Sequence, residues 1–130
     1  MSPPDAQVVR RSRNVLLVED NSDAAVTLGL LLESLGHKVT VVESGERALE
    51  RLGKEKPDVL LVDLGLPGMN GYEVAQRVRD THGKGRPLLV VVTGYGHPMD
   101  RRRSRDAGFD SHLVKPVQVA QLERVLATPP

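Results

Sequence analysis

The stretch that decides the fold runs from Asp58 to Gly71 and reads D-V-L-L-V-D-L-G-L-P-G-M-N-G. Its apolar run, residues 59–62, is too short for a helix and too continuous for a half-exposed strand, so it predicts a central strand covered on both faces. The run ends on the carboxylate of Asp63, and the prolines and glycines that follow favour a loop. We therefore expect Asp63 at the carboxyl edge of a sheet, where open α/β sheets bind ligands.

Outward from this stretch, apolar runs alternate with segments of helical periodicity. The predicted strands are residues 15–18, 39–42, 59–62, 88–92 and a last strand ending at 113–114. The helix after the first strand is expected to begin at the short polar residues 21–23, and Ser44 is expected to cap the second helix. The third follows Gly71, and the last two occupy residues 100–107 and 119–126. Five strand–helix units in a row indicate a parallel sheet with helices on both faces.

Length and composition restrict the function classes. The chain has 130 residues and reads as one domain at 14–127, with a disordered lead or linker at 1–13 and a tail at 128–130. Its net charge of +1 and its few aromatic residues argue against a direct nucleic-acid partner. It has no cysteine and no apolar run near the roughly 18 residues of a membrane helix, so we expect a cytoplasmic protein without membrane insertion.

Chemically active side chains stand where the predicted strands end. Glu19 and Asp20 follow the first strand, Asp63 the third, Thr93 the fourth and Lys115 the fifth. Three converging carboxylates repel one another unless a cation sits among them, and oxygen-only ligands favour Mg²⁺. A lysine and a hydroxyl suit phosphoryl oxygens. The set predicts phosphoryl transfer, with a carboxylate attacking phosphorus while the cation and Lys115 offset the negative charge.

Four motifs resemble the receiver domain of bacterial two-component response regulators. They are V-E-D at 18–20, L-V-D-L-G-L-P-G-M-N-G at 61–71, V-T-G at 92–94 and L-V-K-P at 113–116. Each motif alone is a weak signal, but their joint order and spacing are specific: Thr93 follows Asp63 by 30 residues and Lys115 follows Thr93 by 22. The resemblance covers nearly all of residues 14–127. It implies a flavodoxin-like (βα)5 fold with strand order 2-1-3-4-5.

The same resemblance assigns roles to individual residues. It implies that Asp63 is the phosphoacceptor, with Glu19 and Asp20 as the acidic pocket for Mg²⁺, for which Mn²⁺ is a substitute. The remaining implied roles are a metal-binding backbone carbonyl at Gly65, a switch hydroxyl at Thr93, a phosphate-binding amine at Lys115 and a cis bond between Lys115 and Pro116.

One position departs from the family pattern. The residue three before the lysine is usually a Tyr or Phe that swings between exposed and buried rotamers, whereas here it is His112. His112 is therefore the candidate for this part of the switch, and as an imidazole it would enter the interior only when neutral. Together with the G-Y-G and F-D-S-H-L-V-K-P-V segments, it makes the chain similar to receivers attached to hybrid sensor histidine kinases.

Structural interpretations compete with some of these assignments. Asp20 or Asp63 alone is as readily a helix cap or turn former, and Thr93 alone is more often an ordinary strand residue. Their shared place at one edge with Lys115 favours the functional interpretation. For the arginines at 101, 102, 103 and 105 we favour a solvated helix face over a docking patch.

Three functional hypotheses follow from the sequence. The first is a signalling module, not an enzyme beyond its own phosphotransfer and autodephosphorylation, that takes a phosphoryl group from a sensor histidine kinase or a histidine phosphotransfer domain. It would switch a partner-binding surface made by residues 100–107, 113–114 and 119–126.

The second is an aspartyl-phosphate hydrolase related to haloacid dehalogenases, which usually carry a second Asp where Gly65 stands. The third is an unphosphorylated docking domain, which would be marked by loss of the acceptor, a metal carboxylate or the lysine. No output module is recognisable, so we expect a stand-alone regulator or a fragment of a longer protein.

Overall fold

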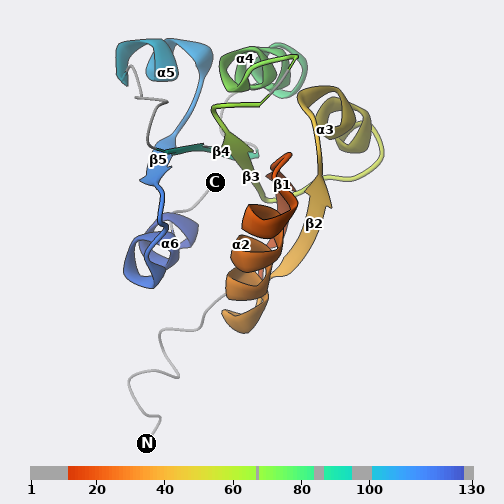
Figure 1. Ribbon diagram of the computed structural model, residues 1–130. Helices are drawn as coiled ribbons and strands as arrows, with labels where there is room; N and C mark the ends of the chain where they lie inside the picture. The colour runs from red at the N-terminus through yellow and green to blue at the C-terminus, as the bar shows by residue number, and fades with distance from the viewer. Residues whose placement is uncertain (1–11, 67, 84–86, 95–100, 128–130) are drawn as a thin grey trace, which may run out of the picture.

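The computed structural model describes residues 12–66, 68–83, 87–94 and 101–127. Strands and helices alternate along the described chain (Figure 1). The strands are β1 (Asn14–Val18), β2 (Lys38–Val42), β3 (Val59–Asp63), β4 (Leu88–Thr93) and β5 (Ser111–Val114). The helices are α2 (Ser22–Ser34), α3 (Gly45–Leu52), α4 (Gly71–His82), α5 (Arg101–Ala107) and α6 (Val119–Leu126).

The five strands form one parallel sheet in the order β2-β1-β3-β4-β5, so the predicted fold is confirmed. Strand β3 lies in the middle, paired with β1 on one side and β4 on the other. Residues 59–62 are fully buried, as expected for a strand covered on both faces. This central position places the end of β3 between the ends of its neighbours.

Side chains alternate between two cores, one on each face of the sheet. Leu17, Leu61 and Val90 point into the core that α2 and α6 cover. Their neighbours along the strands, such as Leu60 and Val91, point into the second core, under α3, α4 and α5. Figure 1 shows these two helical layers on opposite sides of the sheet. The buried side chains of the strands are apolar except for Thr93 at the end of β4, so the polar chemistry is left to the strand ends.

The helix boundaries follow the capping signals in the sequence. The Asn21 side chain accepts a hydrogen bond from the N–H of Ala24 at 3.0 Å, and Ser44 caps α3 in the same way. Asn70, which lies in the segment expected to form a loop, caps α4. Gly36 follows α2 with φ of +93°, a conformation that favours glycine.

Some predicted boundaries differ from the structure. Strand β5 begins at Ser111, and β1 and β2 each start one residue before the predicted limit. Those strands gain a polar first residue, which hydrophobic periodicity does not detect. Most of the predicted lead at 1–13, the tail at 128–130 and residues 95–100, which follow β4, lie outside the described residues.

At the opposite end of the sheet from Asp63, one arginine joins three segments. The Arg79 guanidinium donates to the carbonyls of Gly108 at 3.0 Å, Gly83 at 3.2 Å and Pro87 at 3.1 Å. It also forms an ion pair with Asp110, with 2.6 Å between Nη2 and Oδ2. Because the Arg79 side chain is 10% exposed, these bonds are largely shielded from water. The arginine therefore fixes the end of α4 against the turn between α5 and β5.

Asp110 and Gly108 complete this Arg79 clamp. The Asp110 carboxylate also accepts from the N–H of Leu89 at 2.8 Å, which ties the start of β4 to the same point. A side chain at Gly108 would meet the Arg79 Cγ at 2.5 Å and would have to adopt φ of +105°. The position therefore requires glycine for both space and backbone conformation.

We expect Arg79→Met to lower the free energy of unfolding by about 2 kcal/mol, because it keeps the apolar stem but leaves Asp110 and three carbonyls without their donor. Urea denaturation followed by circular dichroism measures the change. Arg77→Met is the matched control, since Arg77 is an exposed arginine of the same helix. Equal midpoints for the two variants would contradict a stabilising role for the clamp.

Candidate functional site

The predicted site residues meet at one edge of the sheet, and the strand ladder continues one residue past each strand to hold them there. The N–H of Glu19 donates to Val42, that of Leu64 to Val92 and that of Lys115 to Thr93, at 3.0, 3.0 and 2.7 Å. These bonds fix the backbone directly beside the functional side chains. The edge is therefore a rigid platform rather than a set of free loop ends.

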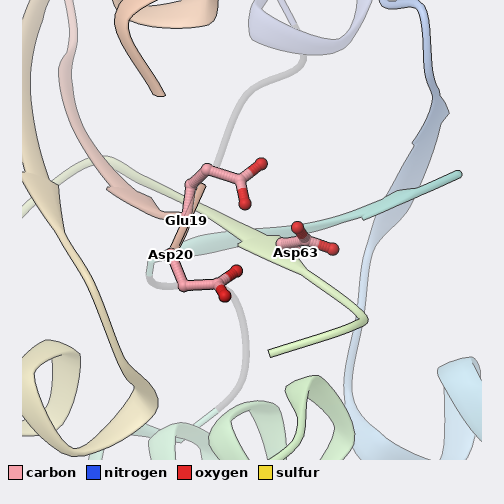
Figure 2. Close-up of side chains that lie close together, drawn as sticks. All are labelled: Glu19, Asp20 and Asp63. Atoms are coloured by element: carbon pink, nitrogen blue, oxygen red, sulfur yellow. The ribbon is translucent and has the colours of Figure 1, made fainter. Parts of the chain in front are cut away.

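Three carboxylates gather at this edge, as the sequence predicted. Glu19, Asp20 and Asp63 each offer an oxygen, and the three oxygens lie within 4.8 Å of one another (Figure 2). Glu19 is buried, Asp63 is half-buried and Asp20 is exposed. The Asp63 Oδ1 accepts a hydrogen bond from the N–H of Gly65 at 2.9 Å, so the loop after β3 orients this carboxylate. We call these three residues the acidic cluster.

Lys115 faces the acidic cluster from the end of β5. Its Nζ donates to Glu19 Oε1 at 2.7 Å and to Asp63 Oδ2 at 3.2 Å. One ammonium thus serves two carboxylates, and the cluster keeps more negative than positive charge. Each oxygen of Asp63 now has a donor, Gly65 on one side and Lys115 on the other.

Burial and these contacts move the pKa values of the three groups apart. Burial raises the pKa of Glu19, the hydrogen bond shared with Asp63 raises it further, and the contact with Lys115 only partly opposes them. Burial alone would also raise the pKa of Asp63, but its hydrogen bonds with Glu19, Gly65 and Lys115 outweigh that effect and lower the pKa. Of these two carboxylates, Asp63 is therefore the one that stays ionised more readily.

Burial and hydrogen bonding also act in opposite directions on the pKa of Lys115. Burial alone would lower its pKa, but the hydrogen bonds with Glu19 and then Asp63 outweigh burial and raise it. The amine is therefore firmly protonated at neutral pH. It provides a fixed positive charge beside Asp63.

Thr93 lies on the same edge, but its hydroxyl does not reach Asp63. The side chain is buried, and Oγ1 donates to the carbonyl of Leu113 at 3.5 Å, the limit of a hydrogen bond. The backbone carbonyl of Thr93 accepts from the N–H of Lys115. Thr93 thus contacts β5 twice, once through each of these groups.

The other predicted positions are placed as follows. The Lys115–Pro116 peptide bond is cis. Gly65 lies beside Asp63 through its N–H, and no partner is recorded for its carbonyl within the described chain. His112 is exposed on β5, where the alternation of side chains puts it on the sheet face opposite to buried Leu113.

One contact in the site was missed from the sequence. Glu19 was expected only as a metal ligand, yet it accepts the shorter of the two Lys115 hydrogen bonds and a longer one from the N–H of Asn21 at 3.3 Å. Glu19 and Lys115 are 96 positions apart, so no local pattern marks the pair. The only signal was that both residues follow a strand.

The donor set fits a small divalent cation. It consists of carboxylate oxygens alone, without sulfur or imidazole, and this chemistry suits Mg²⁺. The charge of the acidic cluster exceeds what Lys115 neutralises, which a cation would correct. The exposed Asp20 side chain leaves one side of the cluster open to water, and Mg²⁺ in proteins usually retains several waters.

Among the described helices, none has the length and apolar character needed to cross a membrane.

Comparison with known proteins identifies relatives along almost the whole chain. A family model for the response regulator receiver domain matches residues 15–127. A gliding motility regulatory protein of Myxococcus xanthus is 34% identical over 116 residues, which cover 88% of this chain and 15% of that protein. The sensor histidine kinase GacS of Pseudomonas protegens is 31% identical over 128 residues, 96% of this chain and 14% of the kinase.

Two further relatives are close to this chain in length. An uncharacterized 14.6 kDa protein of Leptolyngbya boryana is 36% identical over 123 residues, covering 90% of this chain and 93% of that protein. The solved receiver domain of a Pseudomonas aeruginosa sensor histidine kinase matches with a TM-score of 0.79 and 31% identity. The match covers 89% of this chain and 95% of the solved domain. That domain holds a magnesium ion in its active site cleft.

The similarity to receivers of sensor histidine kinases, expected from the sequence, is confirmed by these relatives. The strand order and the position of the acidic cluster agree with the same family. Because the family model spans residues 15–127, the chain belongs to the response regulator receiver domain family.

Proposed function

We propose that the chain is a cytoplasmic phosphoacceptor module in which Asp63 receives a phosphoryl group from a phosphohistidine. The donor would be a sensor histidine kinase or a histidine phosphotransfer domain. The observation that carries the proposal is the pair of donors on Asp63, with Gly65 N–H on Oδ1 and Lys115 Nζ on Oδ2. They hold a half-buried carboxylate whose lowered pKa favours the ionised form.

The transfer forms one bond and breaks one. An oxygen of Asp63 bonds to phosphorus, the bond between phosphorus and the donor's imidazole nitrogen breaks, and the electron pair returns to that nitrogen. The lowered pKa of Asp63 supports this role, since only the ionised carboxylate is a nucleophile. The Lys115 ammonium lies 3.2 Å from Asp63 Oδ2. From there it would stabilise the negative charge on the transferred phosphoryl group.

A cation at the acidic cluster would supply the remaining positive charge in the transition state. We propose Mg²⁺, with Mn²⁺ as a substitute, held by Glu19, Asp20, Asp63 and the carbonyl of Gly65. The solved relative with magnesium in its cleft supports this choice. Glu19 must be ionised to bind the cation, although the raised pKa of Glu19 favours its protonated form. The lysine and the cation therefore compete for Glu19.

Phosphorylation would then act on Thr93 and β5. The 3.5 Å bond from Thr93 to Leu113 is weak, so the hydroxyl can leave it to donate to a phosphoryl oxygen. Because Lys115 follows β5 directly and bonds to Thr93, the same shift would alter the surface made by α5, β5 and α6. His112 is the switch candidate on that strand, and its exposure leaves it free to turn inward.

The hydrolase alternative is less well supported. Haloacid dehalogenases usually carry a second Asp two residues after the nucleophile as general acid, and Gly65 offers no side chain for that role. The docking-domain alternative predicts a damaged site, whereas the acidic cluster and Lys115 are all present. We therefore favour the phosphoacceptor.

We expect acetyl phosphate with Mg²⁺ to add one phosphoryl group to the protein, on Asp63, because this carboxylate is ionised and has both donors in place. Intact-mass spectrometry under cold, neutral conditions detects the product. Asp63→Asn, which keeps the shape but loses the nucleophile, should remain unmodified. A phosphorylated Asp63→Asn protein would show that the acceptor is another residue, and steady turnover of unrelated phosphate esters would favour the hydrolase.

Mg²⁺ should stabilise the wild-type protein, since a ligand that binds only the folded state adds about 1.4 kcal/mol when present at ten times its Kd. Asp20→Ala should remove this gain and abolish phosphorylation by acetyl phosphate. Thermal melting in EDTA and in Mg²⁺ measures the effect. Asp80→Ala, which removes an exposed carboxylate from α4, is the control and should behave as wild type. Full labelling of Asp20→Ala would place the cation on other residues.

Glu19→Gln should raise the melting temperature in EDTA and lose the further rise that Mg²⁺ gives wild type. The raised pKa of Glu19 means that its ionised form is less favourable in the folded protein than in the unfolded chain, so at neutral pH it subtracts stability. Replacing it with an uncharged isostere removes that cost. Glu33→Gln, an exposed carboxylate on α2, is the control. A lower melting temperature for Glu19→Gln in EDTA would mean that its bond to Lys115 outweighs the cost of burying its charge.

A further inference from the structure

The border of the sheet on the side away from β5 is formed by β2 (Figure 1). This strand pairs only with β1, so no other strand of the described chain lies on its outer side. The Lys38 N–H donates to the Arg13 carbonyl at 2.9 Å, which shows that Lys38 faces β1. Because backbone groups alternate in direction along a strand, the N–H and C=O groups of Val39 and Val41 face outward. They are the groups to which a further strand would bond.

The side chains of β2 divide between the two faces of this border. Val39 packs against the core under α2, and Val41, two residues later, belongs to the same face and is 44% exposed. Lys38 and Thr40 belong to the opposite face, where they line a hollow together with residues of α3. A strand added here would therefore meet an apolar face on one side and a polar, basic face on the other.

A groove lies beside β2 on the face that α3 covers. It consists of two hollows of about 280 and 360 Å³. The smaller hollow lies between α3 and the end of β2, which it reaches at Val41 and Val42. The larger one lies between the start of β2 and the residues at the end of α3, and Arg51 lines both. We call the two hollows together the α3 groove, and it follows the length of β2.

Basic side chains outnumber acidic ones along the α3 groove. The carboxylates are Glu43, Glu50 and Glu55, and the cations are Lys38, Arg47, Arg51, Lys54 and Lys56. All of these side chains belong to exposed residues. Within residues 12–66, the one ion pair inside the groove joins Arg51 to Glu55 at 3.2 Å. The groove therefore carries an excess of positive charge.

We propose that the outer side of β2 binds an extended acidic segment of a partner protein, which adds to the sheet as a further strand. Its backbone would exchange hydrogen bonds with Val39 and Val41. Because successive side chains of a strand point to opposite faces, acidic residues at alternate positions would lie over the α3 groove. The β-branched residues between them would cover Val41. Lys38 and Arg47, which line different hollows of the groove, are the cations that we expect to pair with the carboxylates.

Two other occupants fit this border less well. A two-fold contact with a second copy of the chain would bring two basic α3 grooves together, and like charges repel. The segment of this chain that precedes β1 carries Arg10 and Arg11 but a single carboxylate, Asp5, so its charge does not complement the groove either. Charge complementarity therefore favours an acidic partner.

The experiment uses a short fluorescein-labelled peptide in which glutamate and valine alternate. A second peptide carries lysine in place of glutamate. Two further peptides are N-methylated, one at every valine and the other at every glutamate, so that each lacks the N–H groups along one of its two edges. Fluorescence anisotropy measures the binding of each peptide to the full chain in the absence of a phosphoryl donor.

Three protein variants test the charge and the backbone separately. Lys38→Glu/Arg47→Glu reverses the charge in both hollows, and Arg77→Glu/Arg102→Glu is the control, which makes the same change in net charge at exposed arginines of α4 and α5. Val41→Pro removes an outward N–H and leaves the bonds from β2 to β1 in place. Circular dichroism and urea denaturation establish that each variant is folded.

The glutamate peptide should bind and the lysine peptide should not. The charge reversal should weaken binding about tenfold, because attractions in the groove become repulsions, whereas the control variant should bind as wild type does. Val41→Pro should also weaken binding. Since only one edge of an added strand faces β2, one of the two methylated peptides should lose binding and the other should keep it.

Three results would overturn the proposal. The first is no binding of the glutamate peptide to wild type, and the second is equal affinity of wild type and the charge-reversal variant. The third is equal affinity of the two methylated peptides, a comparison that remains decisive if Val41→Pro does not fold. Self-association of wild type in sedimentation, without peptide binding, would make a second copy the occupant. Because no phosphoryl donor is present, the test is independent of the phosphoacceptor role of Asp63.

Discussion

The burial of β3 on both faces is the constraint on which the rest of the structure depends. A strand whose residues 59–62 are fully buried needs helices above and below the sheet, and parallel neighbours on each side satisfy its backbone. A charged side chain at this depth in either core would lose its hydration without gaining a partner, which costs free energy. Asp63, the last residue of the strand and half-buried, is the first point at which a charge is tolerated. The fold therefore confines its chemistry to one edge.

At that edge, function conflicts with stability. Three carboxylates within 4.8 Å of one another are unfavourable, and Lys115 neutralises only part of their charge. The raised pKa of Glu19 and the lowered pKa of Asp63 are two consequences of one arrangement, in which the more buried acid holds a proton most readily. The lowered pKa favours the ionised form of Asp63. The crowding of carboxylates that opposes stability is thus also the arrangement on which the proposed nucleophile and cation site depend.

Much of this was predictable from the sequence, and the reasons are local. Apolar runs located the strands, Asn21 and Ser44 marked helix starts, and the rule that parallel strands end at one edge brought Asp63 and Lys115 together. The Arg79 clamp was not predictable, since its bonds to Gly108 and Asp110 span 29 and 31 positions and its sequence context is that of an ordinary helix surface. The weak bond of the Thr93 hydroxyl was not predictable either, because it depends on the distance between β4 and β5, which no local sequence pattern gives.

The two ends of the unit formed by β4, α5 and β5 are held by different kinds of contact. At the end away from the site, Arg79 and Asp110 make several hydrogen bonds at 2.6–3.2 Å, and these join α4, β4 and the turn before β5. At the site, the 2.7 Å bond from the Lys115 N–H holds the Thr93 backbone, whereas the Thr93 hydroxyl has only a 3.5 Å bond to β5. The hydroxyl is therefore the contact at this edge that changes partner at the least cost in free energy, while the clamp keeps the far end in place. Because Val114 pairs in register with Thr93, the exposed side of β5 lies directly beside this weak contact.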